Sequence, residues 1–176
     1  MLRAAAFVLP LVLAGCTVGP ERATGLLVTG SAYTYRVPPN WGPPSEQPEG
    51  YYDSVAVDLA DEQDVWVDKV AVFTLPASAA TSHGIEERAK ERLEAGGQSD
   101  VEVERVTVAG DSDVLHTSSV TPGSDLYDYG PTRVDSFHLF RGDQLFTLSF
   151  NFSTDVPLED SAEVTDVVLS TWTWTD

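Results

Sequence analysis

The chain has 176 residues, with 28 acidic and 10 basic side chains and a formal net charge of −18 at pH 7. Nucleic-acid binding draws its affinity from Lys and Arg side chains that neutralise phosphates, so this charge argues against a nucleic-acid partner. The charge also disfavours close contact with an anionic lipid surface, whereas it can attract cations or a basic partner. Cys16 is the only cysteine, which excludes a disulfide within the chain.

The first residues have the sequence features of a secretory signal peptide. Arg3 supplies one positive charge, and residues 4–13 carry none. An apolar run of this length is too short to span a bilayer, which needs about 20 residues. A basic start, a short apolar core and small residues before a cleavage point are typical of a signal peptide.

The tetrad Leu13-Ala14-Gly15-Cys16 resembles the lipobox of bacterial lipoproteins. The resemblance implies that the sulfur of Cys16 receives diacylglycerol and that the peptide is cut between Gly15 and Cys16. Two or three acyl chains, such as palmitate, anchor a protein stably, whereas one chain holds it only marginally. We therefore expect a lipid-anchored protein on the extracytoplasmic face of the cell membrane, with residues 1–15 as its signal peptide. The alternatives are an ordinary secretory signal that ends in a cysteine and a buried free cysteine.

The rest of the chain divides into a tether and one domain. Residues 16–29 mix small, polar and turn-forming side chains and are expected to form the tether. Residues 30–176 have the size of a single domain. Within them, 38–50 is rich in proline, which disfavours regular strand pairing.

The first half of the domain shows two kinds of periodicity. Segments 33–37, 55–59 and 65–75 are predicted strands, the second half-buried by its alternation and the third buried on much of both faces. Segment 81–95 changes to helical spacing and ends at Gly96-Gly97, so it is a predicted helix.

Two further strands are predicted over 101–108 and 114–120, around a turn at 109–111. The apolar phase slips between Val103 and Val106, which predicts a bulge near Glu104-Arg105.

The clearest hairpin joins 133–140 to 145–153, and helical spacing returns over 158–172. In the second arm Phe146, Leu148, Phe150 and Phe152 share one face, as expected of an antiparallel strand packed on one side. Runs of strands with one helix in the middle and one at the end predict an α+β fold, an antiparallel β-sheet with helices packed on it.

Several of these stretches resemble the PsbP-like fold: YTYRVPPNW, the helix after the third strand, the hairpin DSFHLFRGDQLFTLSF and the closing helix EVTDVVLSTWTW. The resemblance covers about residues 31–174. It implies an α/β/α sandwich of the kind found in accessory and binding proteins that share no single activity. No ligand residue of the family has a matching position in this chain, so the resemblance implies no cofactor.

The residue types of a hydrolytic triad occur together without the expected geometry. Ser136 and His138 share one face of their strand, whereas Asp135 points to the other face. No GxSxG elbow accompanies them, and neither His83 nor His116 stands at HExxH or HxxxH spacing from another histidine. We therefore expect no catalytic set and no enzyme.

Paired aspartates occur at Asp111 and Asp113 and at Asp125 and Asp128. Ca²⁺ favours several such oxygens, but neither pair has the spacing of an EF-hand loop. Solvated acidic loops are the favoured interpretation, and no metal site is expected.

Aromatic side chains indicate a binding surface. Trp41, Tyr51 and Tyr52 flank the proline-rich loop, and Trp and Tyr are enriched where a surface meets a partner. The alternative is that they cap the core. The expected function is a non-enzymatic binding or accessory role in the cell envelope, toward an unknown envelope protein or a small ligand. A carrier or sensor of a divalent cation or small ligand is the alternative function.

Overall fold

The fold was analysed in a computed structural model that describes residues 25–45, 50, 52–61, 68–77, 82–123 and 130–175, with only the backbone of 61 and 82–87. The expected signal peptide, Cys16, Tyr51 and the pair Asp125 and Asp128 lie outside these residues, as do residues 16–24 of the expected tether. No helix in the described part of the chain is long and apolar enough to cross a bilayer.

The main sheet is antiparallel throughout, with the strand order β3-β4-β5-β9-β8-β7-β6. A second, small antiparallel sheet has the order β1-β2-β10. The strands of the main sheet are β3 (Trp41–Gly42), β4 (Ser54–Asp58), β5 (Lys69–Pro76), β6 (Ser99–Val108), β7 (Asp111–Thr121), β8 (Thr132–Arg141) and β9 (Gln144–Ser153). Those of the small sheet are β1 (Leu27–Thr29), β2 (Tyr33–Arg36) and β10 (Thr173–Trp174).

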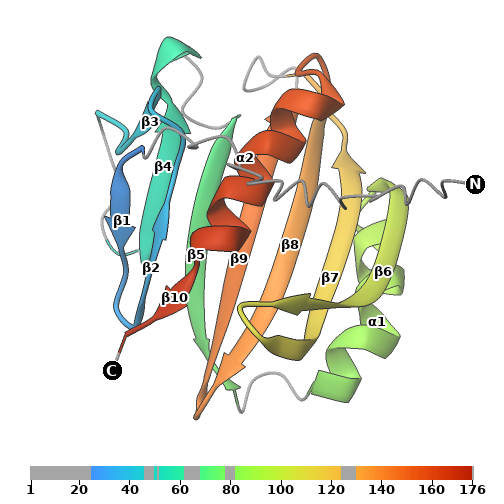
Figure 1. Cartoon of the computed structure of the whole chain (residues 1–176). Coiled ribbons are helices and arrows are strands. Elements are labelled where there is room, and N and C mark those ends of the chain that lie inside the picture. Colours follow the sequence, from blue (N-terminus) through green and yellow to red (C-terminus); the bar gives the residue numbers. More distant parts are fainter. Residues whose placement is uncertain are drawn as a thin grey trace, which may run out of the picture.

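Two α-helices flank the main sheet. Helix α2 (Leu158–Thr171) lies in front of it beside the small sheet, and helix α1 (Ser82–Ala95) lies behind β6 and β7 (Figure 1). A short 3-10 helix, η1 (Leu59–Asp61), follows β4. The predicted α+β fold with helices on an antiparallel sheet is confirmed.

The core lies between the main sheet, helix α2 and the small sheet. The four alternate residues predicted to share one face of β9 are all buried in it. Helix α2 adds Val164 and Val168, four residues apart and therefore on one side of the helix. The other face of β9 is not a simple solvated face, because Ser149 is buried there.

An aromatic stack joins the small sheet and α2 to the main sheet. The rings of Tyr33 and Trp172 are parallel, with centroids 4.3 Å apart and 11° between their planes. Phe146 of β9 meets Tyr33 edge-on at 5.7 Å. The hydroxyl group of Tyr33 forms a 2.8 Å hydrogen bond with Ser54 Oγ of β4. One side chain of β2 therefore contacts two strands of the main sheet and the end of α2.

The end of α1 follows the sequence prediction. Gly97 has φ of +83°, a conformation that glycine adopts without a Cβ clash. Its N–H donates to the carbonyl of Glu94, and the N–H of Gln98 donates to the carbonyl of Leu93, each at 3.0 Å. These two bonds form a Schellman cap, which satisfies carbonyls that the helix leaves free.

The predicted bulge near Glu104-Arg105 is wrong. These residues pair regularly with His116 and Leu115, and the register shifts lie between Ser99 and Glu102 and between Val106 and Val108. The apolar phase slips because both faces of β6 are partly covered, so that regular alternation places Val103 on one face and Val106 on the other.

Three short strands were not predicted. Leu27–Thr29, inside the expected tether, forms β1 and pairs with β2. Trp41–Gly42 pairs with β4 from within the proline-rich segment, because neither residue is a proline and both can enter the ladder. Thr173–Trp174 forms β10 directly after the expected last helix. Strand β4 differs from the half-buried strand that was predicted over 55–59, because Ser54 to Val57 are buried on both faces.

The aromatic stack gives a testable expectation for stability. Trp172→Ala removes a buried ring and is expected to lower the free energy of unfolding by about 3–5 kcal/mol, the usual range for such truncations. Trp172→Phe, the control, keeps a ring against Tyr33 and should lose clearly less. Urea unfolding followed by circular dichroism measures both, and equal losses would contradict the role given to the stack.

Candidate functional site

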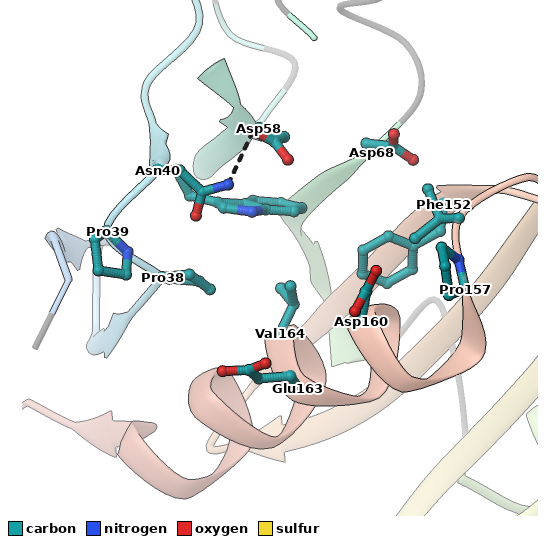
Figure 2. A pocket seen from close by; sticks show the side chains of 12 residues that line it. Pro38, Pro39, Asn40, Asp58, Asp68, Phe152, Pro157, Asp160, Glu163 and Val164 are labelled. Atoms are coloured by element: carbon teal, nitrogen blue, oxygen red, sulfur yellow. Dashed lines mark hydrogen bonds between the residues drawn. The ribbon is translucent and has the colours of Figure 1, made fainter. Parts of the chain in front are cut away.

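A cleft of about 410 Å³ opens between the β2–β3 connection and the start of α2. Figure 2 shows the side chains that line it: Pro38, Pro39, Asn40, Trp41, Asp58, Asp68, Phe152, Val156, Pro157, Asp160, Glu163 and Val164. Four of these are carboxylates and none is Lys, Arg or His. The cleft is therefore strongly acidic, with an apolar and partly aromatic lining.

One wall is set by the prolines that end β2. Pro38 and Pro39 have no N–H to continue the ladder, and the N–H of Trp41 donates to the carbonyl of Pro38 at 3.0 Å, which closes a turn. The turn places the Trp41 ring against Phe152 of β9, with centroids 6.1 Å apart and an edge-on angle of 63°. Because Trp41 is 4% exposed, it supports this wall and only part of its ring reaches the cleft.

The opposite wall is the first part of α2. Pro157 precedes the helix, and its carbonyl accepts hydrogen bonds from the N–H groups of Asp160 and Ser161, each at 3.2 Å. Asp160, Glu163 and Val164 stand three and four residues apart, so helical spacing aims all three at the cleft. Val164 is buried, whereas the two acids are exposed.

The four carboxylates have different surroundings. Asp58 Oδ1 accepts from Asn40 Nδ2 at 3.1 Å and from the N–H of Ala60 at 2.9 Å, and Asp68 Oδ1 accepts from the N–H of Ser153 at 2.7 Å (Figure 2 shows the first of these bonds). Asp160 and Glu163 receive no hydrogen bond or ion pair on their side chains from any described residue. These two acids on α2 are therefore available to a ligand.

The N-terminal segment joins the domain beside this cleft. The carbonyl of Gly25 accepts from Arg36 Nη1 at 2.9 Å, and the carbonyl of Leu26 accepts from the N–H of Val37 at 3.1 Å. A Cβ at Gly25 would lie 1.7 Å from the carbonyl oxygen of Val37 and 2.6 Å from the carbonyl carbon of Pro38. The backbone at Gly25 thus touches a residue of the cleft wall.

Two of the aromatic residues singled out in the sequence, Trp41 and Tyr52, lie in different places. Trp41 lines the cleft, whereas Tyr52 packs against Phe73, with ring centroids 5.0 Å apart. Lys69 Nζ lies 5.8 Å from the centroid of the Tyr52 ring. Tyr51, the third residue of the expected binding surface, lies outside the described residues.

The residues of the apparent triad have separate partners. Ser136 Oγ donates to Ser149 Oγ at 3.2 Å, and His138 Nδ1 lies 3.1 Å from Thr147 Oγ1. Asp135 is on the other face of the sheet, where it meets His116. This arrangement follows the alternation expected from the sequence.

His116 lies between two carboxylates, a cluster that the sequence did not reveal. Its Nδ1 is 3.0 Å from Glu104 Oε1 and its Nε2 is 3.1 Å from Asp135 Oδ1. The ring stacks on Phe137 with centroids 4.4 Å apart. Burial alone would lower the pKa of His116, but the hydrogen bonds to Asp135 and Glu104 outweigh it and raise the pKa above its ordinary value.

His138 is perturbed in the opposite direction. Burial, with a smaller contribution from the charge on His116, lowers the pKa of His138 from 6.5 to about 4.

No set of three or more His, Cys, Asp or Glu side chains in the described ranges is arranged to hold a metal ion. Asp111 Oδ1 accepts from the N–H of Asp113, whose carboxylate pairs with Arg105 at 3.0 Å.

The acids of α2 were the part of the site that sequence reasoning missed. Asp160 and Glu163 lie on the exposed side of an amphipathic helix, where acidic side chains are usual. Their spacing of three residues was a signal of a shared face, but nothing in the sequence indicated that Pro38 stands across from them.

Two solved structures resemble this fold. A Bacteroides thetaiotaomicron protein matches with a TM-score of 0.54 and 13% sequence identity over 88% of this chain and 49% of its own, so the present chain spans about half of it. The solution structure of cyanobacterial PsbP (CyanoP) from Synechocystis sp. PCC 6803 matches with a TM-score of 0.51 and 13% identity, over 92% of this chain and 98% of its own. No family model and no curated protein matches the sequence. The fold is PsbP-like, and at this identity the likeness concerns the fold alone.

The lowered pKa of His138 leads to an expected pH dependence. Between pH 6.5 and 4 this histidine is protonated in the unfolded chain but remains neutral in the folded protein. The free energy of unfolding therefore falls as the pH falls. The loss is expected to reach roughly 3 kcal/mol at pH 4, since a tenfold difference in proton affinity is worth about 1.4 kcal/mol. His138→Gln should remove this part of the loss. Urea titrations at pH 7 and pH 4 compare the two proteins, and identical pH dependence would contradict the assignment.

Proposed function

We propose that this protein is a membrane-anchored extracytoplasmic lipoprotein with a non-enzymatic binding role in the cell envelope, and that the acidic cleft is its binding site. The observation that supports the binding role is the composition of the cleft. Its lining combines four carboxylates with apolar side chains and contains no basic side chain. Lipid anchoring is inferred from the lipobox-like tetrad that ends at Cys16.

The charge of the cleft selects the kind of ligand. Clefts lined by charge of one sign concentrate ligands of the opposite sign, and this effect adds to the overall charge of −18. Asp160 and Glu163 can accept hydrogen bonds from an ammonium or guanidinium group. Such hydrogen bonds are charge-assisted and therefore stronger than those between neutral groups. The edge of Trp41 and the ring of Phe152 offer apolar contact to the alkyl stem of a Lys or Arg side chain. The proposed ligand is therefore a basic group of an envelope partner.

The tether would keep the cleft close to the membrane. An extended chain spans at most about 3.6 Å per residue, so the segment from Cys16 to Gly25 reaches about 30 Å. Gly25 touches Val37 and Pro38 at the cleft wall. A lipid at Cys16 would thus present the cleft to basic segments near the membrane surface.

The separate hydrogen bonds of Ser136 and His138 support a non-enzymatic role. A nucleophile needs a base within hydrogen-bonding reach, and here His138 lies against Thr147 while Ser136 bonds to Ser149. Carriage of a small ligand is the alternative function. For this alternative the acids of α2 can form charge-assisted hydrogen bonds with an organic cation, which is therefore the small ligand that we propose.

Anchoring is tested by replacing the lipidated residue. In cells that carry Cys16→Ser, the protein is expected to leave the membrane fraction, because no thiol remains to receive the diacylglyceryl group. Intact-mass spectrometry of the unmodified protein should show the mass of the chain from residue 16 plus its acyl groups. A mature chain without lipid would contradict the anchor.

The cleft is tested by neutralising its two free acids. Asp160→Asn with Glu163→Gln is expected to weaken binding of spermine and of a pentalysine peptide about tenfold, or about 1.4 kcal/mol, as measured by calorimetry at fixed salt. The control is Glu159→Gln with Asp166→Asn, which makes the same charge change on exposed residues of α2 outside the cleft. Equal losses in the two double variants would show that only overall charge matters and would contradict a site in the cleft.

A further inference from the structure

The stretches of chain that form the small sheet carry almost no charge. Residues 23–45 contain Arg36 and no acidic side chain, and residues 167–175 contain no charged side chain. The whole chain has 28 acidic residues among 176, or about one in six. The small sheet and the last turn of α2 are therefore unusually poor in negative charge for this protein.

Strand pairing separates the two faces of the small sheet. Val28 pairs with Tyr35 and Trp174 pairs with Tyr33, and these four side chains lie in the core or pack against it. Side chains alternate along a strand, so the positions between them point away from the core. We call these positions the outer face, and they are Leu27, Thr29, Thr34, Arg36 and Thr173.

The outer face combines one apolar side chain, three hydroxyl groups and one guanidinium group. Leu27 is 49% exposed, Thr29 and Thr173 are exposed, and Thr34 and Arg36 are half-buried. None of the five is acidic. An acid that contacts the small sheet, Asp53, does so at the turn between β1 and β2, where its Oδ2 accepts two hydrogen bonds from Ser31.

The expected tether meets the domain beside this face. Arg36 Nη1 donates to the carbonyl of Gly25 at 2.9 Å, so the backbone at residue 25 lies against a side chain of the outer face. Cys16 lies nine residues before Gly25, which is at most about 30 Å of extended chain. A lipid at Cys16 would hold the outer face within this distance of the bilayer. Figure 1 shows β6 and α1 on the other side of the molecule from the small sheet.

We propose that the outer face rests on the bilayer, with Leu27 at the boundary between headgroups and acyl chains and Arg36 beside a lipid phosphate. This rests on the lipid anchor of the proposed function and adds the orientation of the domain. A leaflet that contains phosphatidylglycerol repels a chain with a net charge of −18. A face without carboxylates meets less of this repulsion and can approach the headgroups.

The contacts of the outer face need only orient the domain. The acyl chains supply the membrane affinity, and a second, weaker contact then acts on a domain that is already held at the surface. Arg36 has five N–H donors, and among the described residues only its Nη1 is bonded, to Gly25. The other donors can form charge-assisted hydrogen bonds with phosphate oxygens.

The back of the main sheet is a competing face without acids at β5 and β9. Its paired residues include Ala71 with Ser149 and Leu75 with Leu145. Most of this surface is covered, because Ala71, Ser149 and Leu145 are buried, whereas Leu75 is 52% exposed. The core lies between this face and the small sheet, on which Gly25 is bonded. A bilayer contact at Leu75 would therefore require the opposite orientation of the domain.

The test uses the lipidated full chain in vesicles of phosphatidylethanolamine and phosphatidylglycerol, with one fluorescent label on an introduced cysteine. Cys16 is the only native cysteine and its sulfur would carry the lipid, so the label attaches at one position. Leu27→Cys places it on the outer face, Leu75→Cys on the back of the main sheet, and Ala95→Cys on the exposed end of α1. Lipids with a quencher near the headgroup or near the chain ends measure contact and depth.

The label at position 27 is expected to shift its emission to the blue and to lose intensity to the quencher near the headgroups. The same label at positions 75 and 95 should keep the emission of an aqueous label. Membrane recovery should be equal in the three proteins, because the lipid and not the outer face holds them.

Added acids test whether the outer face sets this orientation. Thr29→Glu with Thr173→Glu is expected to remove most of the quenching at position 27, and to do so more completely with phosphatidylglycerol than in phosphatidylcholine vesicles. The control is Ser99→Glu with Thr107→Glu, the same charge change on exposed residues of β6, which should leave the quenching intact.

Four results would overturn the proposal. Quenching at position 75 or 95 in place of 27 would show another orientation, and an aqueous label at all three would show a domain that stands off the bilayer. A blue-shifted label at 27 without lipid quenching would assign the face to a protein. Unchanged quenching with the two glutamates on the outer face would show that the tether alone brings residue 27 to the lipid. All four leave the anchor standing if the intact mass includes acyl groups, whereas a mature chain without lipid would contradict the anchor and the orientation together.

Discussion

The stack of Tyr33 on Trp172 is the contact on which the rest of the structure depends. It lies where β2, the end of α2 and the main sheet meet, with centroids 4.3 Å apart and with Phe146 against its edge. The two walls of the acidic cleft come from the segment after β2 and from the start of α2. Because the same aromatic contact joins both elements, the separation of the two walls depends on buried side chains that do not line the cleft.

Two acids of the cleft lack partners of their own among the described residues. Asp160 and Glu163 gain nothing from a partner within the described structure, although the first turn of a helix does favour acidic side chains. Their position in the acidic cleft is the feature on which the proposed binding role rests.

Periodicity in the sequence predicted the elements that are long enough to show a period. The hairpin of β8 and β9, with Phe146 and Phe150 on its buried face, and both helices were predicted within a few residues of their bounds. β1, β3 and β10 were missed because two or three residues show no period, and their pairing is fixed by tertiary contacts. For the site, Trp41 was placed in the correct loop. Tyr52 was grouped with it, whereas the structure places the two residues apart, because the chain turns back after β3 and pairs Trp41 with Asp58, at the far end of β4 from Tyr52.

The central claim is that the cleft contacts a partner in the cell envelope. Site-specific photo-crosslinking tests it most directly, with a benzophenone side chain introduced at Glu163 in the lipidated protein in its own membranes and, as the control, at Asp166, which is equally on α2 and outside the cleft. The account predicts a discrete adduct from position 163 that is lost when salt screens the charges, and none from position 166. Adducts of the same size and yield from both positions, or an adduct from position 166 alone, would contradict it.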